Sequence, residues 1–232
     1  MQDAEHPAPE AMVTLDALEA RVLGCLIEKE ATTPDVYPLS LNALVNACNQ
    51  KNNRAPVMEL GEREVEGALD RLRGKRLVTA FSGANARAIK YKHRFGERFP
   101  VEPLAQAMLA ELMLRGPQTT AGLRGNCERM AAVPDLAGCE ALLVHLTGGA
   151  EPLVRKLPRQ PGQKEARWVQ LLTGEPSADE LAGNEGAREP LKVAVAMTLP
   201  PEVETRLAAL EAEVAALKSE LARLRKALGE TG

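Results

Sequence analysis

The sequence predicts an α+β fold, mainly helical, with two tandem winged-helix domains followed by a C-terminal coiled-coil helix. Apolar residues at helical spacing give way to strand-like alternation near residues 77–95, the same order returns over residues 103–172, and heptads run through residues 203–228. Three helices followed by a β-hairpin are typical of a helix-turn-helix core with an attached ribbon. We expect five segments: a flexible N-terminus (1–13), winged-helix domain 1 (14–99), winged-helix domain 2 (100–174), a flexible linker (175–199) and the coiled-coil helix (200–229).

The first unit contains three predicted helices. The first begins after Thr14, where Asp16 and Glu19 have the spacing of a capping box. Ser40 can cap the second helix, and the third starts near Gly61. The third helix has a single apolar stripe, which indicates that one side is buried. This stripe consists of Val65, Ala68, Leu69 and Leu72.

A predicted β-ribbon completes the first unit. Residues 77–81 form a short apolar run, and a turn is expected at residues 82–85. The following strand alternates apolar side chains with cations, so we expect the apolar set to face the core and the cations to face outward. The apolar set is Ile89, Tyr91, His93 and Phe95, and the cations are Lys90, Lys92 and Arg94.

The second unit repeats this order. Pro103 suits the first turn of a helix that stops at Gly116, Thr119 or Thr120 opens the next helix, and Asp135 caps a third. Strands are expected at residues 153–157 and 167–172, on either side of a turn at residues 161–162.

The first helix of the second unit, residues 104–114, is apolar on almost every side. Such a helix requires burial on more than one side. We expect it at the junction between the two units or in a dimer interface. It could equally be the central helix of its own unit.

Four stretches of the sequence resemble the YceH-like family of uncharacterised bacterial proteins. They are LEARVLGCLIEK (18–29), YPLSLNALVNACNQKNNRAPVM (37–58), LRGPQT (114–119) and LPRQPGQKEAR (157–167). The resemblance covers residues 14–175 and implies two winged-helix domains in tandem. The family has no assigned active site, so the resemblance implies nothing about activity.

The C-terminal heptads predict a dimerisation helix. Opposite charges at the flanking positions, such as Glu213 with Lys218, favour a parallel homodimer. The alternative is a helix that folds back onto the body of its own chain. The predicted dimerisation residues are Leu207, Leu210, Val214, Leu217, Leu221, Leu224 and Leu228.

Composition and charge restrict the function. The formal net charge is −3, yet residues 71–98 hold nine Lys and Arg residues against Glu97, which is the strongest electrostatic feature of the sequence. Aromatic residues make up only 3% of the chain, so a base-stacking platform built from an aromatic cluster is not expected. The four cysteines stand singly, and no signal peptide or membrane-spanning stretch is evident. We expect a soluble cytoplasmic protein.

The sequence gives little support to an enzymatic function. The three histidines are scattered, and no phosphate-binding loop or catalytic constellation has a recognisable spacing. We therefore predict no enzymatic activity, no cofactor and no metal site.

The leading hypothesis is a DNA-associated protein, such as a transcriptional regulator, whose basic wings bind the phosphate backbone of double-stranded DNA as a dimer. The alternative is a protein-interaction scaffold with an unidentified protein partner, because the third helix of the first unit begins with three glutamates. The candidate nucleic-acid-binding residues are Lys51 and Arg54 in the loop after the second helix, Arg71, Arg73, Lys75, Arg76, Arg87, Lys90, Lys92 and Arg94 around the first ribbon, and Arg155, Lys156, Arg159 and Lys164 around the second.

Overall fold

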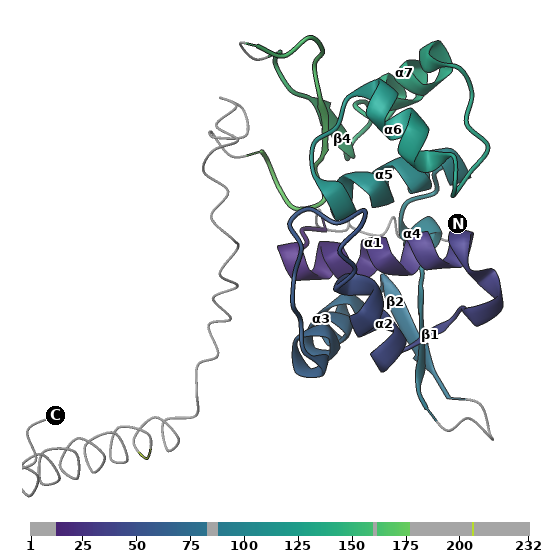
Figure 1. Cartoon of the computed structure of the whole chain (residues 1–232), viewed down its shortest axis with the longest axis vertical. Helices are drawn as coiled ribbons and strands as arrows, with labels where there is room; N and C mark the ends of the chain where they lie inside the picture. The colour runs from purple at the N-terminus through teal and green to yellow at the C-terminus, as the bar shows by residue number, and fades with distance from the viewer. Residues whose placement is uncertain (1–12, 83–87, 160–161, 177–205, 207–232) are drawn as a thin grey trace, which may run out of the picture. The chain divides into compact units, whose positions relative to one another are not determined.

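The computed structural model describes residues 13–82, 88–159, 162–176 and 206 (Figure 1). Residues 13–176 belong to one compact unit of helices and two small antiparallel sheets. The predicted N-terminal tail before residue 13, the predicted linker after residue 176 and every predicted dimerisation residue lie outside the described part of the chain. None of the helices that the described residues form has the length and apolar character needed to cross a bilayer.

The first half of this unit has the predicted helices and ribbon. The Asp16 carboxylate accepts hydrogen bonds from the backbone N–H groups of Leu18 and Glu19, and Ser40 accepts one from Ala43, so both predicted caps are confirmed. The elements are α1 (Ala17–Thr32), a 3-10 turn η1 (Pro34–Val36), β1 (Leu39–Ser40), α2 (Leu41–Cys48), α3 (Glu62–Gly74), β2 (Val78–Phe81), β3 (Lys90–His93) and α4 (Phe95–Arg98).

The sheet of the first half differs from the prediction in two places. The two-residue strand β1 was not expected; it pairs with β3, which makes a three-stranded sheet in the order β1-β3-β2. Phe95 does not continue the strand, because the chain turns into α4 there and carries the ring into the core. Ile89 was expected to face the core but is 52% exposed, because it precedes β3 at the open end of the ribbon.

The second half follows the same order. Its helices begin where the sequence predicts, with Pro103 in the first turn of α5 and Thr119 and Asp135 as caps, and α5 ends as predicted at Gly116, which has a φ of 75°. The elements are α5 (Pro103–Arg115), α6 (Thr120–Cys127), α7 (Leu136–His145), β4 (Val154–Lys156) and β5 (Trp168–Gln170).

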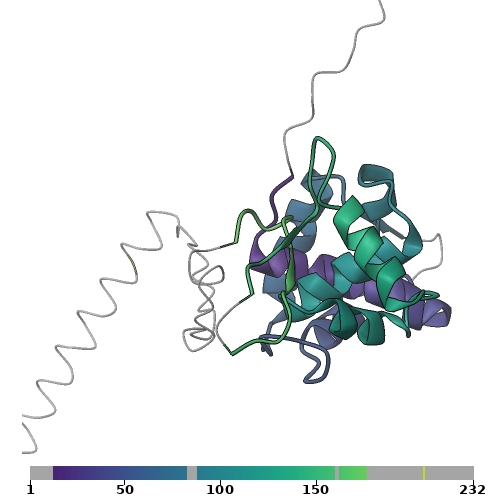
Figure 2. The same ribbon diagram turned by 90° about the horizontal axis from the view of Figure 1, so that it is seen from above.

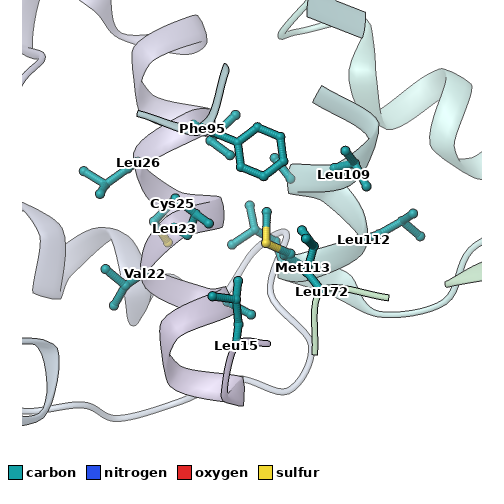
Figure 3. Packing of buried hydrophobic residues seen from close by; sticks show 14 of the residues in the cluster. Leu15, Val22, Leu23, Cys25, Leu26, Phe95, Leu109, Leu112, Met113 and Leu172 are labelled. Atoms are coloured by element: carbon teal, nitrogen blue, oxygen red, sulfur yellow. The ribbon is translucent and has the colours of Figure 1, made fainter. Parts of the chain in front are cut away.

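The core is continuous between the halves, because α1 packs along α5. Figure 2 shows the second half lying over the first, and Figure 3 shows Leu23 and Cys25 of α1 in one cluster with Leu109 and Met113 of α5. Residues 104–114 therefore lie at the junction, as one of the expectations proposed. Their apolar side chains are covered within the single chain, so α5 is not the dimer interface that the sequence also allowed.

Candidate nucleic-acid interface

The outward side of the first sheet presents two lysines and an aromatic ring. In the antiparallel register, Lys90 lies opposite both Ser40 and Phe81, and Lys92 lies opposite Thr79. Opposed residues share one face of a sheet, and successive residues alternate between faces. Tyr91, between the two lysines, is buried, so these five side chains point away from the core. We call Ser40, Thr79, Phe81, Lys90 and Lys92 the ribbon face.

The two lysines of the ribbon face are available to a ligand. Lys92 is exposed and Lys90 is half-buried, and neither forms an ion pair with another residue of the described part of the chain. The prediction that Lys90 and Lys92 project outward is therefore confirmed. An anion can therefore bind these lysines without first displacing them from an internal salt bridge.

Most of the other predicted cations of the first half have acidic partners. Arg71 lies 2.9 Å from Asp16, Lys75 lies 2.6 Å from Glu19, Arg73 lies 3.0 Å from Asp70, and Arg94 pairs with Glu97. The basic surface is consequently less continuous than its sequence suggests. Arg76 is exposed just after α3, and Arg87 lies outside the described residues.

Arg54 is not a surface residue, which corrects its place among the candidates. Its guanidinium is fully buried, lies 2.5 Å from the Glu28 carboxylate, and also donates to the carbonyl oxygen of Ala47. Arg54 therefore organises the loop after α2 and cannot reach a phosphate. Lys51 in the same loop is exposed, as expected.

The buried acid Glu28 is the centre of a charged cluster that links the halves. Arg129, which follows α6, lies 2.7 Å from Glu28 of α1 and also pairs with Glu111 of α5. Burial by itself would raise the pKa of Glu28, but the hydrogen bonds and charge of Arg54 outweigh it and hold that pKa below its ordinary value. Burial dominates at Glu111 and raises its pKa despite Arg129. This cluster was not predicted from the sequence, although its acids are charged residues inside the apolar helices α1 and α5.

The second ribbon is less basic than predicted. Arg155 pairs with Glu175, and Lys156 pairs with Glu140 while its ammonium lies 5.1 Å from the centre of the Trp168 ring. Arg159 and Lys164 are exposed and have no ionic partner within the described residues. The second ribbon thus offers two free cations near its turn.

The helices α3 and α7 occupy the same place in the order of elements but have different outer faces. The exposed side chains of α3 are charged, including Arg63, Glu66 and Asp70. On α7 the exposed side chains include Leu136, which is 49% exposed, and Val144, which is 54% exposed. An apolar outer face provides no hydrogen bonds to base edges.

Potential reactive side chains of the described part are buried or dispersed. His93 faces the core, with Nε2 at 2.7 Å from Glu30, and burial lowers its pKa. No group of three or more His, Cys, Asp or Glu among the described residues is arranged to hold a metal ion. All four cysteines are buried free thiols, namely Cys25, Cys48, Cys127 and Cys139.

Comparison with known proteins places the chain in a family. The sequence profile of the family described as "Protein of unknown function, DUF480" matches residues 15–163. A "UPF0502 protein" of Citrifermentans bemidjiense is 54% identical over 175 residues, which cover 75% of this chain and 81% of that protein. A "UPF0502 protein" of Shewanella amazonensis is 46% identical over 204 residues, which cover 84% of this chain and 97% of that protein. The chain therefore belongs to the DUF480, or UPF0502, family of bacterial proteins, the YceH-like family that its sequence resembles.

Proposed function

We propose that this protein is a non-enzymatic, DNA-associated tandem winged-helix protein that binds the phosphate backbone through its first ribbon. The observation that carries this proposal is the pair of lysines on the ribbon face, Lys90 and Lys92, which form no ion pair within the described residues. Two adjacent free cations on an outward strand favour an anionic ligand. A dimer through residues 203–228 would present two such ribbons and increase affinity through effective concentration.

The winged-helix part of the proposal rests on the order of elements. Each half has three helices followed by an antiparallel ribbon: α1, α2, α3, β2 and β3, then α5, α6, α7, β4 and β5. In winged-helix proteins the third helix and the ribbon are the surfaces that approach DNA. Here α3 begins with Glu62 and Glu64, which phosphates would repel, so the ribbon is the better contact.

This binding mode makes a quantitative prediction about salt. Lysine contacts to phosphates release counterions, so affinity falls as salt rises, with a logarithmic slope of about −0.9 for each phosphate neutralised on duplex DNA. Because phosphates carry no sequence information, we expect little preference between DNA sequences. A role in transcription would then require a specificity that the ribbon does not supply.

The test is a salt titration of duplex DNA binding by the full chain. Lys90→Glu combined with Lys92→Glu should abolish binding, and the salt slope identifies the number of phosphates contacted. Arg159→Glu combined with Lys164→Glu makes the same change in net charge on the second ribbon and should have the smaller effect. Equal losses from both pairs would show that net charge, and not the ribbon face, controls binding.

A second candidate function is a protein-interaction scaffold, favoured by the apolar outer face of α7. Leu136 and Val144 lie exposed on this helix with Ala137 and Ala141 between them. Helix-in-groove recognition uses apolar anchors at such spacings. Absence of DNA binding at low salt, together with recovery of a protein partner that Val144→Glu releases, would favour this function.

A further inference from the structure

Phe81 is the exposed aromatic residue of a chain with few aromatics. The chain contains three Phe, two Tyr and one Trp, all of them described. Phe95, Phe99, Tyr91 and Trp168 are buried and Tyr37 is half-buried, whereas Phe81 is 42% exposed. Burying a phenyl ring normally stabilises a fold, so an uncovered ring suggests a role in contact with something else.

The position of the ring is well defined by strand pairing. Phe81 ends β2 and lies directly opposite Lys90, on the outward side of the sheet. Neighbouring strands are about 5 Å apart, and residues two apart along a strand are separated by about 7 Å. The ring and the ammonium groups of Lys90 and Lys92 therefore surround one small area of the ribbon face.

A ring beside two cations matches the chemistry of an unpaired nucleotide strand. The ring can stack on the face of a base, and the lysines can contact the phosphates beside it. In a duplex the base faces are covered by their neighbours, so this ring could meet only base edges, sugars or a kinked step. Every base has a π-face that can stack on the ring, which predicts binding with little sequence preference.

We propose that the ribbon face binds single-stranded nucleic acid, with one base stacked on Phe81 and the flanking phosphates on Lys90 and Lys92. This inference rests on the proposed function, since it uses the same lysines. It differs from the proposed function in two respects. The preferred ligand is single-stranded and not duplex nucleic acid, and Phe81 supplies the non-ionic part of the affinity.

Ile89 provides a matched control on the same ribbon. Its side chain is 52% exposed, so it is similar to Phe81 in size, apolar character and accessibility. Ile89 precedes β3 and has no partner in the strand register, so it is not part of the ribbon face. Loss of a large exposed apolar side chain is thus compared within the ribbon face and just outside it.

The experiment measures binding of the full chain to labelled oligodeoxythymidine and to a duplex of the same length, as a function of salt. We expect the single strand to bind more tightly. Phe81→Ala should weaken single-strand binding by roughly 5- to 150-fold, the effect expected from removing one stacked base. The salt slope should not change, because no phosphate contact is lost. Ile89→Ala should bind as the unaltered chain does.

A Phe81→Trp variant tests stacking directly. Its affinity should be retained, and its added fluorescence should be quenched when the oligonucleotide binds, whereas Trp168 is 1% exposed and supplies a constant background. Circular dichroism of each variant checks that the fold is intact, which is expected for exposed positions.

The outcomes separate the two proposals. Duplex binding that is tighter than single-strand binding, or a Phe81→Ala variant with unchanged affinity, would overturn the stacking inference and leave the phosphate-binding function standing. Absence of binding to either oligonucleotide at low salt would overturn both.

Discussion

Removing the buried Arg54 guanidinium should destabilise the protein more than removing any exposed cation. Arg54 lies 2.5 Å from the Glu28 carboxylate, and it also donates to the carbonyl oxygen of Ala47 and to Gln50. Arg54→Met keeps most of the side-chain volume but leaves Glu28 buried beside Arg129 as its remaining strong partner. We expect a loss of about 3–5 kcal/mol in the free energy of unfolding, the typical cost of breaking a buried pair by removing one partner.

The matched control is Arg73→Met. Arg73 also forms an ion pair, with Asp70 at 3.0 Å, but both of these side chains are more than half exposed. Exposed pairs of this kind contribute at most about 1 kcal/mol. The difference between the two variants therefore isolates the effect of burial. Replacing Glu28 by Gln in the Arg54→Met background should recover part of the loss, because a buried charge that has lost one of its partners is removed.

The stability lost in Arg54→Met should also depend on pH, and it should decrease as the pH falls. In the unaltered chain the pKa of Glu28 is held below its ordinary value. The ionised Glu28 therefore stabilises the folded state at pH values above its pKa in the unfolded chain, and this stabilisation is lost as the pH falls through its pKa in the folded chain. Without Arg54, its hydrogen bonds and charge no longer lower the pKa of Glu28, so that pKa rises, while Lys29 and Arg129 still act in the lowering direction. As the pH falls from neutral, protonation of Glu28 removes the buried charge in Arg54→Met. The difference in the free energy of unfolding between Arg54→Met and the unaltered chain should therefore become smaller.

Urea unfolding followed by circular dichroism at neutral and mildly acidic pH measures these quantities. A loss below about 1 kcal/mol at neutral pH, or a gap that widens in acid, would refute the assignment of Arg54 as the compensating charge of Glu28.

Three further predictions concern packing, assembly and thiol chemistry. Gly24→Val should cost roughly 1–3 kcal/mol of stability, because a Cβ at this position would lie 3.0 Å from Leu114 of α5. Gly125→Val is the control and should not have this cost, because nothing lies within 4 Å of a Cβ there. Thermal unfolding compares the two variants. Deletion of residues 200–229 should change the mass measured by light scattering from that of a dimer to that of a monomer, and a monomeric full chain would contradict the heptad prediction. Native protein should react slowly with a thiol reagent and should release all its thiols on unfolding, because the cysteines are buried and burial raises the pKa of Cys127 to about 12; rapid native labelling would be inconsistent with these positions.

Local sequence signals were sufficient for the order of six helices (α1, α2, α3, α5, α6 and α7) and the two ribbons, but not for η1, β1 or α4. Asp16, Ser40, Thr119 and Asp135 all cap helices as expected, because a capping side chain interacts with backbone groups only two or three residues away. The change from helical to strand period likewise located both ribbons. The mixed α/β class and the family could therefore be predicted from the sequence.

The candidate site was predicted less completely, because burial and ion pairing depend on distant parts of the chain. Nothing near Arg54 in the sequence shows that Glu28, on α1, pairs with it and neutralises its charge. The strand β1 is only two residues long and exists because β3 provides its partner. Phe81 could have been found, since alternation from buried Val78 places it on the outward side.

The central claim, that the ribbon face is where nucleic acid binds, is tested most directly by NMR titration of the isotopically labelled full chain with an oligonucleotide. We expect the largest amide shift changes at residues 78–81 and 90–93, on both strands of the first ribbon. Shift changes concentrated on α7, or none at a concentration that saturates binding, would contradict the claim.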